Sequence, residues 1–144
     1  MNHDVRHSLA DILDREIVVA QALTETLAAE RDALTGDSAH ALRRKAADKV
    51  RLLGNIEALE AERRALWESP SAEGGPGSVV ADRWRKLMEL VAACRSANEV
   101  NGHIIHIRQN QIRQLFDIVR GGASMTYGPQ GKTFARALRA LAQA

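Results

Sequence analysis

The five histidines of the chain include two pairs whose spacing could place two metal ligands on one helical face. His3 and His7 are four residues apart, and His103 and His106 are three apart. Residues at these spacings lie on the same side of a helix. A zinc site needs a third and usually a fourth ligand, and no cysteine or acidic residue is suitably placed near either pair. We therefore expect surface histidines, no metal site and no other cofactor.

The sequence offers no pattern typical of a catalytic site. Gly128, Gly131 and Lys132 have a superficial likeness to a phosphate-binding loop, but their spacing differs from G-x-x-x-x-G-K-[ST] and no strand precedes them. Cys94 is the only cysteine, so it cannot form an internal disulfide. Its position on an apolar helical row predicts a small buried residue. Because no polar residues converge on one place, we expect no enzymatic activity.

Charge is distributed unevenly along the chain. Residues 1–102 carry 14 basic and 17 acidic groups, whereas residues 103–144 carry six basic groups and one acid, Asp117. This basic end suggests an acidic partner. Three cations, one tyrosine and one phenylalanine in the last 24 residues are too few for a typical nucleic-acid footprint, so we expect no nucleic-acid partner.

Apolar periodicity indicates where the chain is helical. Apolar residues recur at steps of three, four or seven over about residues 4–34, 38–67 and 78–120. Thr35-Gly36-Asp37-Ser38 supplies a helix stop and a new N-cap, and the proline- and glycine-rich residues 69–78 form a linker. The pattern predicts an all-α fold of three long antiparallel helices without strands. No signal-peptide layout or membrane-spanning apolar run is present, so we expect a cytoplasmic protein without membrane insertion.

The third helical segment is longer than its two neighbours. It would span about 60 Å, against roughly 45 Å for each of the others. One end must therefore project, bind a partner or fray. Trp84 opens its apolar row, and we expect it to anchor the start of the helix by burial.

The middle of this segment contains residues that are unusual in a helix interior. Asn98 and Asn101 fall on the inward row, and Gly102 follows them. Asparagine and glycine are poor helix formers. We expect the two asparagines to make buried polar contacts that set the helix register, with Gly102 permitting a close approach. The alternative is a pair of half-exposed asparagines at a helix seam.

A second organisational boundary is predicted near the C-terminus. Gly121-Gly122 should end the third helix, dividing a three-helix body (1–120) from a tail (121–144). The tail begins with a turn-rich element that contains Tyr127. Beyond it, Phe134, Leu138 and Leu141 form a short amphipathic row that is marginal as a helix in water, so we expect it to be mobile until bound.

Three motifs carry a resemblance to a known family. In chain order they are Asp82-Arg83-Trp84, Asn98-Glu99-Val100-Asn101-Gly102 and Thr126-Tyr127-Gly128-Pro129-Gln130-Gly131. A less specific pattern in the first two helical segments also fits: Glu30, Leu34, Leu42, Lys49, Leu52, Leu53, Leu59 and Arg63. The chain resembles the FlgN family of flagellar export chaperones over nearly its whole length.

This resemblance implies a cytoplasmic chaperone for the hook–filament junction proteins FlgK and FlgL. Such a chaperone binds the C-terminal helical region of its client, prevents premature assembly and delivers the client to the flagellar type III export gate. It also implies that the C-terminal region binds the client and that Tyr127 and Gly128 dock to the gate component FlhA.

The unpartnered apolar row and the amphipathic tail are typical of a protein that receives a helical partner in a groove. The residues expected to bind the client are Ile112, Leu115, Phe116, Val119, Phe134, Leu138 and Leu141. A structural or self-assembling coiled-coil protein without a client remains the alternative. A nucleic-acid-binding module is the second rival, and its binding would weaken steeply with salt.

Overall fold

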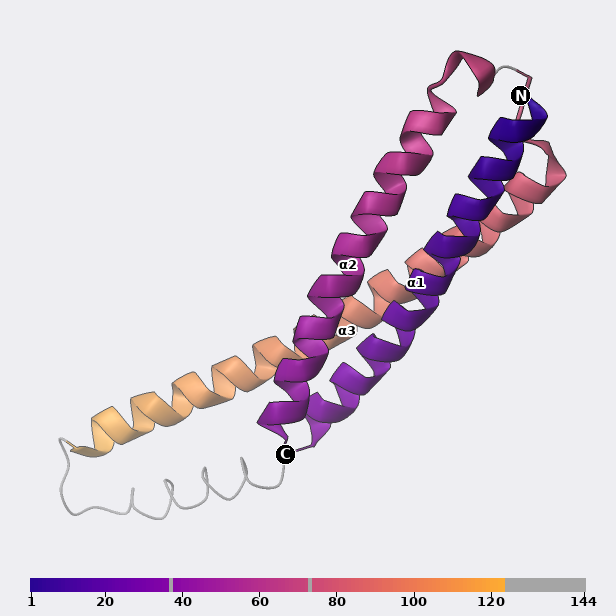
Figure 1. The fold of residues 1–144 in the computed structure, drawn as a ribbon. Coiled ribbons are helices and arrows are strands. Elements are labelled where there is room, and N and C mark those ends of the chain that lie inside the picture. Colours follow the sequence, from indigo (N-terminus) through magenta and orange to yellow (C-terminus); the bar gives the residue numbers. More distant parts are fainter. Residues whose placement is uncertain (37, 73, 124–144) are drawn as a thin grey trace. The chain divides into compact units, whose positions relative to one another are not determined.

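The computed structural model describes residues 1–36, 38–72 and 74–123 of the chain. It contains three long helices, α1 (His3–Thr35), α2 (Ala39–Trp67) and α3 (Gly77–Ala123), and a short 3₁₀ turn at Pro70–Ala72. No strand occurs within these described residues. Successive helices run in opposite directions, as Figure 1 shows for α1 and α2. The predicted all-α class with three long antiparallel helices is confirmed.

The helix ends lie close to the positions that the sequence predicts. The Asn2 side chain accepts a hydrogen bond from the Asp4 backbone N–H at 3.3 Å, and Ser38 Oγ accepts one from the Ala41 N–H at 3.1 Å. Each cap satisfies a donor that the first helical turn leaves without a partner. The Gly36 N–H closes α1 by donating to the Asp32 carbonyl at 2.9 Å.

The linker between α2 and α3 depends on its glycines. Gly74, Gly75 and Gly77 have φ angles of 100°, 79° and 76°, a region that side chains with a Cβ rarely adopt. The N-terminus packs against this linker, since the Asn2 N–H donates to the Ser71 carbonyl at 3.1 Å. The path of the linker therefore depends on backbone conformations, at Gly74, Gly75 and Gly77, that only glycine adopts readily.

The end of α3 differs from its prediction. Gly121-Gly122 was expected to stop the helix at residue 120, but α3 continues through both glycines to Ala123. The cost of glycine in a helix, about 1 kcal/mol relative to alanine, does not break a helix that is already formed. The division into a body (1–120) and a tail (121–144) remains a prediction.

The chain separates into two compact units, residues 1–101 and residues 102–144. The boundary lies inside α3, between Asn101 and Gly102.

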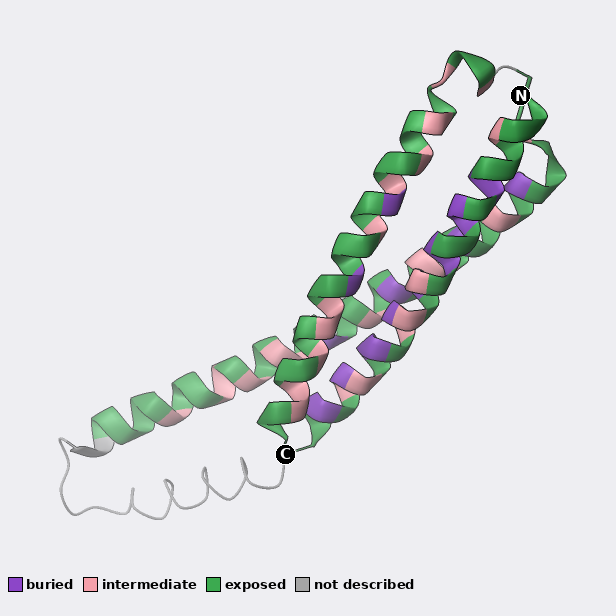
Figure 2. Ribbon diagram, in the orientation of Figure 1, coloured by how far each residue is buried: buried purple, intermediate pink, exposed green. Residues whose placement is uncertain are grey.

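In the first unit, α1 is the central helix. It contributes most of the buried residues, whereas α2 buries only Leu52 and Leu59 (Figure 2). One apolar cluster joins α1 to α3; its members are Leu9, Ala10, Leu13, Ile17, Ala20, Val80 and Leu87. A second cluster joins all three helices; its members are Leu23, Leu27, Leu52 and Cys94. The predicted burial of Cys94 is confirmed, because the residue is 7% exposed.

Candidate functional site

Asn101 ends the first unit and is almost completely buried, at 1% exposure. Its Nδ2 donates to the Leu27 carbonyl and to Glu30 Oε1, both at 2.9 Å. Its Oδ1 accepts a hydrogen bond from Arg31 Nε at 3.1 Å. A buried amide is costly unless its donors and acceptor are satisfied. Here those partners lie on one turn of α1. That Asn101 sets the register of α3 against α1 remains a prediction, and these contacts are the ones it requires.

Glu30 extends this contact to the second helix. Its carboxylate is 2% exposed and lies 2.9 Å from Lys49 Nζ of α2. Lys49 Nζ also donates to Asn98 Oδ1 at 3.4 Å. A buried carboxylate requires both a charge partner and hydrogen bonds. Glu30 therefore joins α1, α2 and α3 in one polar network.

The expectations for Asn98 and Gly102 are corrected by the structure. Asn98 is exposed, not on the buried row with Asn101. A Cβ added at Gly102 would meet no described atom within 4 Å, so this glycine permits no close approach. Gly102 directly follows Asn101, so the 100° advance per residue turns it away from α1. Asn98 is three residues before Asn101 and lies at the exposed edge of the same face, where it accepts a hydrogen bond from Lys49 of α2.

A second polar contact lies nearer the start of α1. Arg63 Nε donates to Glu16 Oε2 at 2.9 Å, and Glu16 is 2% exposed. Burial raises the pKa of the Glu16 carboxyl group above its ordinary value of 4.5, and the Glu60 charge adds to the rise. The charge and hydrogen bond of Arg63 oppose that rise. The sequence signal for this contact is a charged residue, Glu16, on the apolar row of residues 4–34, because a charged side chain at such a position is buried only when it is paired.

Trp84 does not have the buried position predicted for it. It is 41% exposed, and the Arg63 guanidinium lies 4.6 Å from its ring centroid. A cation over the face of an indole ring is attracted by its quadrupole. The buried side chains near the start of α3 are instead those of Val80 and Leu87, which are 4% and 5% exposed. Trp84 thus leaves part of its surface free.

In the second unit, the predicted client-binding residues that can be described are accessible. Ile112, Phe116 and Val119 are 50%, 62% and 45% exposed, and Leu115 is half-buried. Steps of four and three residues bring Ile112, Phe116 and Val119 onto one helical face. The sequence interpretation missed two other large apolar residues of this segment, Ile107 and Ile118, which are 56% and 37% exposed.

The remaining predicted site residues lie outside the described part of the chain. They are Tyr127, Gly128, Phe134, Leu138 and Leu141. Their assignments to the client and to the export gate remain predictions.

The histidine pairs show no sign of a shared site in the described residues. His3, His7, His103 and His106 are all exposed. Within residues 1–36, 38–72 and 74–123, no group of three or more histidine, cysteine, aspartate or glutamate side chains could hold a metal ion. In the same part of the chain, no helix has both the length and the hydropathy that a bilayer crossing needs.

Comparison with known proteins gives one match. Residues 1–134 match the model of the protein family described as FlgN protein. No curated protein and no solved structure matches the chain.

Proposed function

The chain belongs to the FlgN family of flagellar export chaperones, and on this basis we propose that its clients are the hook–filament junction proteins FlgK and FlgL. Chaperones of this family bind flagellar proteins. The proposed client segment is the C-terminal helical region. Binding in the cytoplasm would prevent premature assembly, and the complex would then deliver the client to the export gate through FlhA.

The observation that carries this proposal is the exposed apolar face of residues 102–123. Ile112, Phe116 and Val119 expose about half or more of their surface and follow one another on the same side of α3. A contiguous apolar surface exposed to water is typical of an interaction site. The spacing suits a helical partner, which presents apolar residues at the same period.

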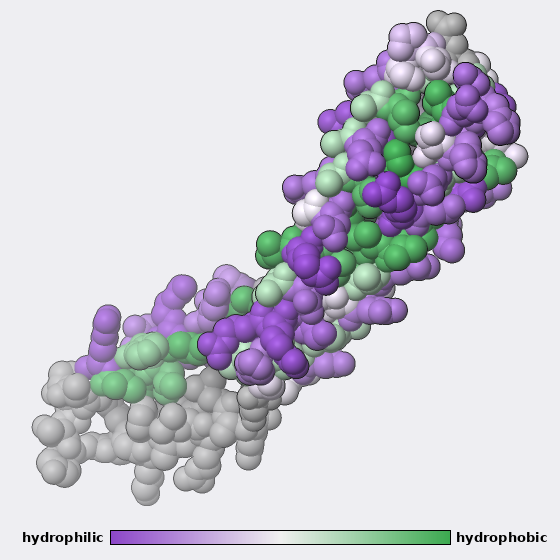
Figure 3. All heavy atoms as spheres, viewed as in Figure 1, coloured by the Kyte–Doolittle hydropathy of each residue, from purple (hydrophilic) through white to green (hydrophobic). Residues whose placement is uncertain are grey.

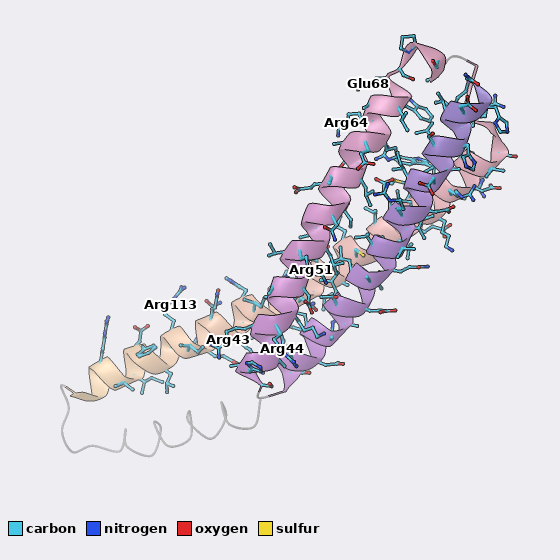
Figure 4. The ribbon with its side chains drawn as sticks, viewed as in Figure 1. Arg43, Arg44, Arg51, Arg64, Glu68 and Arg113 are labelled. Carbon is cyan, nitrogen blue, oxygen red and sulfur yellow. The ribbon has the colours of Figure 1, made fainter. Side chains whose placement is uncertain are left out.

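The charge of this segment supports an acidic partner. Residues 103–123 contain Arg108, Arg113 and Arg120 against the single acid Asp117. Figure 4 shows the labelled Arg113 side chain extending from the helix, and the residue is exposed. An acidic client helix would find both an apolar face and cations here. Phe134, Leu138 and Leu141 are proposed to extend this contact, and Tyr127 and Gly128 to dock to FlhA.

A titration of the full chain with a C-terminal fragment of FlgK or FlgL tests the proposal. Phe116→Ser should weaken binding at least about tenfold, because truncating a central aromatic contact commonly costs more than 1.4 kcal/mol. Val18→Ser is the matched control, since Val18 is 64% exposed but lies on α1. The far-ultraviolet circular dichroism of both variants should equal that of the parent.

The proposal fails if the full chain binds neither fragment. It also fails for this face if Phe116→Ser and Ile112→Ser both bind as tightly as Val18→Ser.

A self-assembling helical protein without a client is the second candidate function. The same exposed face of residues 102–123 favours it, because two copies could cover each other there. Light scattering after size exclusion over a range of concentrations distinguishes the two. A mass that rises with concentration, returns to the monomer in Phe116→Ser and accompanies no client binding would support self-assembly.

A further inference from the structure

A cleft opens in the first unit, and none of the residues assigned above to the client lines it. Leu9 and Leu13 of α1 contribute its apolar base, and residues of α2 and α3 form its sides. Its volume is about 450 Å³. Ligand-binding clefts commonly enclose about 300–1,000 Å³ and have largely apolar walls. This cleft is therefore large enough to receive bulky side chains of a partner.

Both tryptophans of the chain line this cleft. Trp67 of α2 is 50% exposed, and Trp84 of α3 is 41% exposed. Tryptophan supplies large apolar area at low conformational cost, and it is enriched among the residues that dominate binding energy at interfaces. Two half-exposed tryptophans on facing helices are an apolar surface that the first unit itself does not cover. Figure 3 shows that hydrophobic residues also gather on one side of this unit between hydrophilic ones.

The charged residues among those that line the cleft are both arginines, Arg63 and Arg64. Glu16 and Trp84 hold Arg63 in place, and the Arg63 side chain is only 18% exposed. Arg64 is different, because 64% of its side chain is exposed and its partner Glu60, at 2.6 Å, does not line the cleft. An exposed ion pair one helical turn apart contributes little stability. The Arg64 guanidinium can therefore exchange Glu60 for a carboxylate of a partner.

We propose that this cleft is a second client contact, which receives a bulky apolar side chain that lies beside a carboxylate on an amphipathic helix of the exported protein. The inference rests on the proposed function. The apolar side chain lies between Trp67 and Trp84, and the carboxylate binds Arg64. The chain's own C-terminal segment is a poor occupant, because it carries Lys132, Arg136 and Arg139 and no acid, so its charges repel the arginines of the cleft.

Tryptophan emission tests occupancy directly. Since both tryptophans line the cleft, the intrinsic fluorescence of the chain reports on this place, and Ile112 and Phe116 lie on a segment without tryptophan. A tryptophan-free C-terminal fragment of FlgK or FlgL is titrated into the full chain, with calorimetry in parallel. We expect the emission to change and to saturate at the stoichiometry that calorimetry gives. Calorimetric binding with unchanged emission would overturn the cleft and leave the proposed function intact, whereas absence of binding would overturn both.

A matched pair of charge reversals tests the role of Arg64. Arg51 is its control, because it lies on the same helix, has a side chain that is also 64% exposed and pairs with an acid one turn away. Figure 4 labels both residues on α2. Arg64→Glu should weaken binding of the client fragment about tenfold, with a smaller dependence on salt than the parent. Arg51→Glu should bind within about twofold of the parent. Equal losses in the two variants would indicate general attraction to a basic chaperone and would overturn the specific contact.

Two other occupants give distinct outcomes. If the chain's own tail fills the cleft, removal of residues 124–144 changes the emission of the free chain. If a second copy fills it, the free chain is a dimer that Trp67→Ala dissociates. Either result would overturn the proposal, whereas unchanged emission after truncation and a monomeric free chain are the expected results.

Discussion

Asn101 Nδ2 lies 2.9 Å from Glu30 Oε1, and this bond joins a buried amide of α3 to a buried carboxylate of α1. Both side chains are at most 2% exposed. Lys49 supplies the countercharge from α2 at 2.9 Å. Three helices therefore meet at a polar network whose members depend on one another. The first two predictions concern this network.

Asn101→Leu should destabilise the first unit by about 1–3 kcal/mol, because it removes the amide that donates to the buried Leu27 carbonyl and to the Glu30 carboxylate. Ser96→Leu is the control at an exposed position of the same helix and should change the free energy of unfolding by no more than about 0.5 kcal/mol. Urea unfolding followed by circular dichroism measures both. Similar values for the two variants would contradict the buried network.

Glu30→Ala should destabilise by about 1–3 kcal/mol, since Lys49 and the Asn101 amide both lose an acceptor in a buried place. Glu25→Ala, at an exposed position of the same helix, should be close to neutral. In a double-mutant cycle, Glu30→Ala and Lys49→Met together should cost less than the sum of the two single changes. Strict additivity would show that the two charges do not interact.

Glu16 predicts a specific pH dependence. Its pKa in the folded chain is raised above the ordinary value of 4.5, so the folded state holds this proton to higher pH than the unfolded state does. The resulting stabilisation is complete below about pH 4.5 and is lost as the pH rises through the raised pKa. Glu16→Gln lacks this loss. Its melting temperature relative to the parent should therefore rise between pH 4.5 and neutrality, while Glu25→Gln runs parallel to the parent.

The effect of replacing a glycine with alanine should depend on where the glycine lies in the fold. Gly54→Ala and Gly102→Ala should each stabilise by about 0.5–1 kcal/mol, because no described atom lies within 4 Å of the added Cβ and alanine is the better helix former. Gly74→Ala should be destabilising, since its φ is +100° and the Cβ would lie 2.6 Å from the Met1 nitrogen. Thermal melts give the sign of each change. A loss of stability in Gly54→Ala would indicate a contact on the outer face of α2.

Tyr127→Ala should separate binding from export. If this residue docks to the gate, the variant binds a FlgK or FlgL fragment like the parent but secretes the client poorly. Removal of residues 124–144 should instead reduce binding as well, with little change in melting temperature, because the described apolar clusters lie within residues 1–101. A titration beside a secretion assay measures both. Equal loss of client affinity in the two variants would contradict this division of roles.

The sequence by itself determined the three helices and all of their ends except the last, the C-terminal end of α3. Apolar residues at helical steps, the Gly36 and Ser38 boundary and the glycine-rich linker are local signals, and local signals decide where a helix begins and ends. The three motifs likewise identified the family, which the match over residues 1–134 confirms. The glycine pair at 121–122 was misleading, because the cost of glycine is small compared with the cooperativity of a long helix.

Only the tertiary structure decided which polar residues are buried and what they contact. Asn98 and Asn101 differ by three positions on one helix, but Asn101 faces Glu30 while Asn98 is exposed. For the same reason, the sequence did not predict the Glu16–Arg63 ion pair or the half-exposed position of Trp84 beside a cleft. Burial depends on how neighbouring helices cross and on which side chains they bring, over separations of 47 to 71 residues in these two contacts. Periodicity within one helix carries no information about those partners.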